Sequence, residues 1–306
     1  MRGIPDTPRA RSVPPEAFKI QEKLEAPMAY KSLLTVLTDP NTSASPMNQL
    51  IALAEAQDAH AEALCLGVDR TQTGYYYAGA NAMIVQETLT RAHTEAGETL
   101  EWAKTALASS GVRWSAEDGV AQIADIGRLV AYRARFADLV IQGRPYGEKQ
   151  GAEAEPIVEA SLFEGRVPVL VVPDDVEPLR KPKTVLAAWN ESVEALVAIR
   201  KAMPFLKEAD LVRIVVIDPP SHGPERSDPG GMLSQMLARH GVQCEIDVLS
   251  KTMTRVSDVL NRHATDTEAD MIVMGAYGHS RFREAILGGA TRNMLEKATV
   301  PVFMAH

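Results

Sequence analysis

The sequence ADLVIQG at residues 137–143 has a near copy, ADMIVMG, at residues 269–275. Each copy places alanine and aspartate before a short, mostly apolar run that ends in glycine. A run of this length and composition is typical of a strand buried on both faces of a parallel sheet. The two copies therefore predict the same buried strand at two places in the chain.

Two further pairs of segments follow the same order. The closing segment VPVLVV at 167–172 corresponds to VPVFMA at 300–305, and the Gly-Val pair at 111–112 returns at 241–242. The offsets of the three pairs are nearly constant, which indicates a tandem duplication. The length of 306 residues agrees with two units of roughly 150 residues each.

Proline and charge mark the boundaries of the two units. Residues 1–27 are rich in both and lack periodicity, so we expect a disordered N-terminal extension. Residues 174–183 combine prolines with charged residues and are predicted to form a stiff linker. The predicted domains are therefore residues 28–173 and residues 184–306.

Apolar, branched segments alternate with helical patterns in both halves. Strands are predicted near 31–37, 62–68, 112–116, 138–142 and 168–172, and again at 184–189, 211–217, 243–249, 271–274 and 302–304. Helices are predicted at about 80–109, 191–203, 229–240, 253–267 and 289–297. This alternation predicts an α/β fold of two tandem doubly wound, five-stranded parallel sheets of the Rossmann-like type. Cys65 falls in a predicted core strand, and alternation places Cys244 and Val248 on one core-facing side of another.

Composition narrows the classes of function. The net charge of −8 argues against nucleic acid and anionic membranes as partners, and no apolar run reaches the roughly 18 residues needed to span a bilayer. The two cysteines lack ligand spacing, so we expect no metal site and a cytoplasmic protein. No catalytic constellation with supporting motif context is present, so no catalytic residue is assigned.

A glycine-rich loop follows the strand at 271–274. Gly275 and Gly278 are separated by two residues, and nine residues later Gly288 and Gly289 open a predicted helix. Such a loop can adopt positive φ, and the N–H groups of the following helix can receive phosphate oxygens. The first strand of the half ends near Asn190, which should lie at the same edge of the sheet. The candidate ligand-binding residues are Asn190, Gly275, Gly278, His279, Gly288, Gly289 and Thr291.

The duplicated unit, the Ala-Asp strand, the glycine loop and the Val-Pro-Val strand together resemble the universal stress protein family over residues 28–306. The resemblance implies the strand order 3-2-1-4-5 and kinship with adenine nucleotide α-hydrolase-like folds. It implies ATP, with Mg²⁺, between the end of the first strand and the glycine loop. It also implies that fifth strands pair with each other. A tandem chain can form this pair between its own two halves, and the alternative is a pair between the two chains of a homodimer.

The chain departs from the family pattern at several positions. Gly288 is followed by Gly289 where the family has serine or threonine, and Asn190 stands where an acidic residue is common. In the first half, the segment from Gly143 to Gly147 has one residue too many, and residues 148–157 are acidic. We therefore expect the first-half site to be degenerate, because acidic groups repel phosphate.

Each candidate also has an interpretation without a ligand. The glycines can simply shape a turn, Asn190 and Ser192 can cap a helix, and His279 can be an ordinary loop residue. Asp39, at the corresponding first-half turn, is expected to hydrogen-bond within its own turn rather than to contact a ligand. The sequence thus favours a stress-response or regulatory protein that binds ATP or a related adenine nucleotide in its second domain, with at most slow ATP hydrolysis. The alternative is an interaction and dimerisation protein of the same fold that binds no nucleotide.

Overall fold

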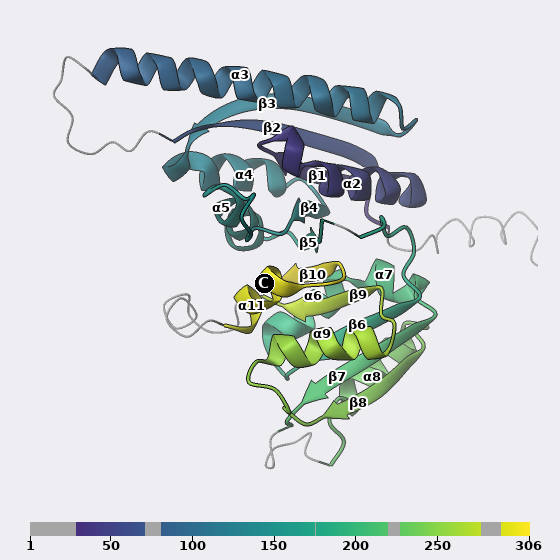
Figure 1. Ribbon diagram of the computed structural model, residues 1–306. Helices are drawn as coiled ribbons and strands as arrows, with labels where there is room; N and C mark the ends of the chain where they lie inside the picture. The colour runs from purple at the N-terminus through teal and green to yellow at the C-terminus, as the bar shows by residue number, and fades with distance from the viewer. Residues whose placement is uncertain (1–28, 71–80, 175, 220–226, 277–288) are drawn as a thin grey trace, which may run out of the picture.

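The computed structural model describes residues 29–70, 81–174, 176–219, 227–276 and 289–306. These residues form one ten-stranded sheet with helices on both faces (Figure 1). The predicted α/β class is therefore confirmed. The predicted N-terminal extension, residues 1–27, lies outside the described residues.

The described residues of the first half form five strands and four helices. The strands are β1 (Ser32–Leu37), β2 (His60–Asp69), β3 (Arg113–Gln122), β4 (Leu139–Gly143) and β5 (Val169–Val172). The helices are α2 (Ala44–Gln57), α3 (Asn81–Ala108), α4 (Ile126–Ala134) and α5 (Ala154–Glu159), with short helical turns at Pro40–Thr42, Ile123–Asp125 and Ala160–Glu164.

The second half repeats this alternation. Its strands are β6 (Thr184–Trp189), β7 (Leu211–Ile217), β8 (Cys244–Leu249), β9 (Met271–Gly275) and β10 (Val302–Ala305). Its helices are α6 (Val193–Lys201), α7 (Met203–Glu208), α8 (Gly231–Arg239), α9 (Val256–Asp266) and α11 (Ala290–Lys297). None of the helices in the described part of the chain is both long and apolar enough to cross a bilayer.

The strand order is β3-β2-β1-β4-β5-β10-β9-β6-β7-β8, so each half has the order 3-2-1-4-5 that the family resemblance implies. Neighbouring strands of the described residues run parallel within each half. At the centre, β5 and β10 pair antiparallel, with Leu170 opposite Phe303. The two Val-Pro-Val strands thus cover each other's edges, which would otherwise present unpaired backbone groups.

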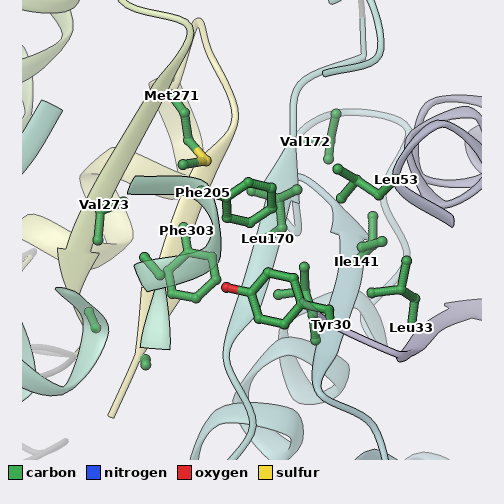
Figure 2. Packing of buried hydrophobic residues seen from close by; sticks show 14 of the residues in the cluster. Tyr30, Leu33, Leu53, Ile141, Leu170, Val172, Phe205, Met271, Val273 and Phe303 are labelled. Atoms are coloured by element: carbon green, nitrogen blue, oxygen red, sulfur yellow. The ribbon is translucent and has the colours of Figure 1, made fainter. Parts of the chain in front are cut away.

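Aromatic side chains from both halves pack beside this central strand pair. Figure 2 shows Tyr30 of the first half close to Phe205 and Phe303 of the second. The Tyr30 and Phe205 ring centroids lie 5.3 Å apart, and those of Phe205 and Phe303 lie 6.0 Å apart. The Tyr30 hydroxyl donates a hydrogen bond of 2.7 Å to the backbone oxygen of Lys201, and burial raises its pKa well above the usual value. Apolar burial and one buried hydrogen bond therefore both join the halves.

The repeated Ala-Asp pair has the same structural role in each half. The Oδ2 atom of Asp138 accepts hydrogen bonds from the backbone N–H groups of Lys31 and Ser32, at 2.7 and 3.0 Å. The Oδ2 atom of Asp270 accepts from Lys183 and Thr184, at 2.6 and 2.9 Å. Each aspartate precedes the fourth strand of its half and fastens the start of the first strand. The same contact between aspartate and backbone is therefore present in both halves.

The structure corrects the predicted elements at three points. The predicted helix 191–203 ends at Lys201, and α7 begins at Met203 with Pro204 in its first turn. Strand β3 runs on to Gln122 because it pairs with β2 along its whole length. The core-facing prediction for Val248 is wrong, because β8 lies at the edge of the sheet and 53% of Val248 is exposed. Cys65 is buried and free, as predicted, whereas Cys244 is half-buried.

Candidate functional site

The candidate site lies at the carboxyl ends of β6 and β9. These strands are neighbours, and Ala187 pairs with Val273, so Trp189 and Gly275 end the two strands at the same level. Strands β7 and β8 lie on one side of this pair and β10 lies on the other, so the strand order reverses here. Doubly wound sheets bind ligands at this kind of switch point. Asn190, the next residue after Trp189, is therefore brought to the same edge as Gly275.

Asn190 is exposed and takes part in the turn that starts α6. Its Oδ1 atom accepts a hydrogen bond of 3.2 Å from the backbone N–H of Ser192. The Ser192 hydroxyl in turn accepts from the N–H of Ala195 at 3.1 Å and caps the helix. Glu191, between them, has a positive φ of 62°. Ser192 is therefore the residue that caps α6, whereas Asn190 bonds the backbone of Ser192 just before the helix and is itself exposed to solvent.

Gly275 lies against the first turn of α6. A Cβ atom added at this position would be 2.5 Å from the backbone nitrogen of Ala195 and 2.7 Å from the carbonyl carbon of Glu194. Real Cβ atoms essentially never come this close to backbone atoms. Close helix–strand packing therefore requires glycine here, whether or not a ligand binds.

Gly289 and Thr291 lie at the start of α11. Gly289 immediately precedes the helix, and its carbonyl accepts a hydrogen bond of 3.1 Å from the N–H of Asn293. Thr291 is 3% exposed, so its side chain belongs to the interior of the protein. The remaining predicted site residues, Gly278, His279 and Gly288, lie outside the described residues.

The first turn of α11 contacts the first half of the chain. The guanidinium of Arg292 lies over the ring of Tyr146, 5.0 Å from its centroid. The Tyr146 hydroxyl donates a hydrogen bond of 2.7 Å to Oε1 of Glu155. A hydrogen bond to Glu296, the nearby Tyr146 and the charge of Glu155 raise the pKa of Arg292. The segment that follows β4 therefore supports the helix that follows the second-half glycine loop.

The equivalent edge of the first half is arranged differently. Asp39 accepts hydrogen bonds of 2.9 Å from both the backbone N–H and the Nδ2 atom of Asn41, which is the turn chemistry predicted for it. Arg70, directly after β2, lies 2.6 Å from Oε1 of Glu153, directly before α5. Sequence reasoning missed this pair, although Arg70 follows a predicted strand and Glu153 lies in the acidic segment that was singled out.

Metal ligation has no candidate in the described part of the chain. No group of three or more histidine, cysteine, aspartate or glutamate side chains there could hold a metal ion.

Known proteins resemble this chain in sequence and in structure. The sequence model of the universal stress protein family matches residues 181–306. Universal stress protein Slr1230 of Synechocystis sp. (strain ATCC 27184 / PCC 6803 / Kazusa) is 27% identical over 140 residues, which are 44% of this chain and 45% of that protein. The match thus spans less than half the length of that relative. The crystal structure of a universal stress protein from Archaeoglobus fulgidus DSM 4304 has a TM-score of 0.64 at 16% identity, and the alignment covers 89% of this chain and 95% of that one. Residues 181–306 therefore form a domain that matches the universal stress protein family.

Proposed function

We propose that the second half binds an adenine nucleotide, ATP in the first place, and that this binding serves a regulatory role in a stress response. The observation that carries the proposal is the juxtaposition of Asn190 and Gly275 at the strand-order reversal of a universal stress protein domain. Family resemblance implies ATP at this position. Gly278, His279, Gly288 and Gly289 complete the proposed site, together with the backbone of Thr291, whose side chain is buried.

The side chains at this edge have suitable chemistry for the ligand. An asparagine amide offers both donor and acceptor groups, so Asn190 can hydrogen-bond an adenine edge or a ribose hydroxyl. The start of α11, behind Gly289, offers backbone N–H groups and the positive end of a helix dipole to the phosphates. Binding rather than catalysis is the proposed activity, with ATP hydrolysis slow at most.

Isothermal titration of Mg²⁺–ATP into the purified full chain tests the proposal. We expect saturable binding that Asn190→Ala weakens by about tenfold, the equivalent of roughly 1.4 kcal/mol. Asp39→Ala, at the corresponding turn of the first half, is the matched control and should leave the affinity unchanged. The absence of any heat, together with no nucleotide retained through purification, would exclude the nucleotide function.

A second candidate function is that of an interaction protein without a nucleotide. Three local observations favour it, because packing and capping alone explain them. Gly275 is required by α6, the Asn190 side chain already bonds Ser192, and Gly289 offers no hydroxyl. The same titration distinguishes the two functions, since this alternative predicts no heat from any adenine nucleotide.

We also propose that the two halves stay paired in solution through β5 and β10, so that the chain is a monomer. The shared aromatic cluster around Phe205 supports this assembly. Light scattering should then report 33.2 kDa, and twice this mass would favour the homodimer. Cys65 and Cys244 are both free, which supports a reducing compartment and hence a cytoplasmic location.

A further inference from the structure

Arg70 links two segments at the carboxyl edge of the first half-sheet. Its Nη2 atom lies 2.6 Å from Oε1 of Glu153, and its Nη1 atom lies 3.3 Å from Oε2 of Glu95 on α3. Arg70 leaves β2, Glu153 follows β4, and these two strands flank β1 in the sheet. The ion pair with Glu153 therefore joins the segments on either side of the switch point, where a doubly wound sheet receives its ligand.

Glu153 is the buried member of this pair. Its side chain is 3% exposed, whereas that of Arg70 is 45% exposed. A carboxylate buried in this way is costly unless a cation and hydrogen bonds compensate it. Burial opposes the protonated form of Arg70, but its hydrogen bond to Glu153 and the charges of Glu153 and Glu95 raise its pKa overall. The guanidinium of Arg70 therefore keeps its charge at neutral pH.

The hydrogen bonding around this pair is incomplete. The Oε2 atom of Glu153 is buried and has no partner among the described residues. Gly151 leaves room for the carboxylate, because a Cβ atom there would overlap it. Packing alone does not explain a charged oxygen that is buried without a partner, and a group of this kind in a folded protein calls for a functional explanation.

A carboxylate held by an arginine has the charge and the oxygen spacing of a bound oxyanion. We propose that the carboxylate of Glu153 fills a small-oxyanion site at the ligand-binding edge of the first half, with Arg70 as its counter-charge. The site is closed by the chain's own side chain, and it accepts inorganic phosphate once that carboxylate is removed. This inference does not depend on nucleotide binding by the second half.

Thermal unfolding of the full chain in potassium phosphate, compared with potassium chloride of equal ionic strength, tests the proposal. In Glu153→Ala, phosphate should raise the unfolding midpoint by about 2 °C or more, because a ligand that binds only the folded state stabilises it. Glu153→Gln keeps the volume of the side chain and should show no such rise, and neither should the wild type. Any phosphate bound by the second half contributes equally to all variants and cancels in the comparison.

Two further variants assign the effect to the site. The double variant Arg70→Ala with Glu153→Ala should lose the phosphate effect, because it lacks the counter-charge. Glu95→Ala, which removes the other partner of Arg70, should behave like the wild type. If a folded Glu153→Ala shows no rise, or if the double variant keeps it, the proposal is overturned. If Glu153→Ala does not fold in potassium chloride, phosphate should restore the folding of Glu153→Ala or of Glu153→Ser. The proposal is also overturned if phosphate restores the folding of neither variant.

Discussion

Arg133 on α4 and His263 on α9 occupy corresponding positions in the two halves, 130 residues apart, and each binds a carboxylate of the third strand in its half. The Nη2 atom of Arg133 lies 2.7 Å from Oε2 of Glu117 on β3. The Nε2 atom of His263 lies 2.7 Å from Oδ2 of Asp247 on β8. Glu117 and Asp247 are also 130 residues apart, so the two halves make the same contact between helix and strand with different side chains.

The strand beside this contact, β2 in the first half and β7 in the second, carries residues of opposite charge at the corresponding position. In the first half, Glu62 of β2 also contacts Arg133, at 2.8 Å. In the second half, the corresponding position of β7 holds Arg213, which lies 3.1 Å from Asp247. The first-half cluster thus depends on Arg133 for its positive charge. The second-half cluster keeps Arg213 as a cation even if His263 is replaced.

This difference predicts unequal costs of mutation. Arg133→Ala leaves Glu62 and Glu117 without a cation and should lower the free energy of unfolding by about 1–3 kcal/mol. His263→Ala should cost about 1 kcal/mol or less, because Arg213 still pairs with Asp247. Urea titration measures both. Arg128→Ala, at an exposed pair on the same helix as Arg133, should stay within about 0.5 kcal/mol of the wild type, and equal costs for Arg133 and His263 would contradict the interpretation.

The repeated aspartates predict matched effects in the two halves. Asp138→Ala and Asp270→Ala each remove an acceptor of two backbone N–H groups at the start of a strand. Each should cost about 1–3 kcal/mol in a urea titration. The exposed Asp266→Ala, which loses only an i,i+4 pair with Arg262, should cost less than about 0.5 kcal/mol. If Asp270→Ala lowers the free energy of unfolding as little as Asp266→Ala does, the hydrogen bonds from Asp270 to the strand backbone contribute little to stability.

The packing of Gly275 predicts opposite outcomes for two glycine replacements. Gly275→Ala forces a methyl group into the backbone of α6 and should destabilise the protein by about 1–3 kcal/mol or more. Gly97→Ala, inside α3 with no atom near the added methyl, should stabilise it by about 0.5–1 kcal/mol. Thermal unfolding distinguishes the two directions. An unchanged unfolding midpoint for Gly275→Ala would contradict the prediction, because it would mean that α6 shifts at no cost to make room for the methyl group.

The two cysteines should differ in reactivity. Burial, and secondarily the charge of Asp118, raises the pKa of Cys65 to about 12, so its thiol stays protonated and shielded at pH 8. Half-buried Cys244 should react first with a thiol reagent, and Cys65 only after unfolding. Rapid labelling of two thiols in the native protein would contradict this order.

The same shift makes stability depend on pH. Because the folded state keeps the Cys65 proton longer than the unfolded state, this contribution is complete below the ordinary pKa near 9 and is lost as pH rises toward 12. Urea titrations of the wild type and Cys65→Ala across this range should therefore converge with increasing pH. A constant difference between them would contradict the raised pKa.

The local pattern of apolar and polar residues predicted most of the fold. The features that it did not predict depend on contacts between residues far apart in the sequence. The bounds of β6 and β7 agree with the predicted strands, because both segments are mostly apolar. Val248 was misplaced because alternation does not reveal that a strand lies at the edge of the sheet. Topology brought Asn190 beside Gly275, as the sequence implied. The contact between Arg70 and Glu153 spans 83 residues, and nothing in either local sequence indicates the partner.

The stacking of Arg292 on Tyr146 has a mechanical consequence. Arg292 lies in the first turn of α11, and Tyr146 is fixed by Glu155 in the other half. A displacement of α11 on ligand binding would therefore push directly on a loop of the first half. The first half thus supports the helix that follows the glycine loop of the second half, and this contact couples the position of α11 to the segment around Tyr146.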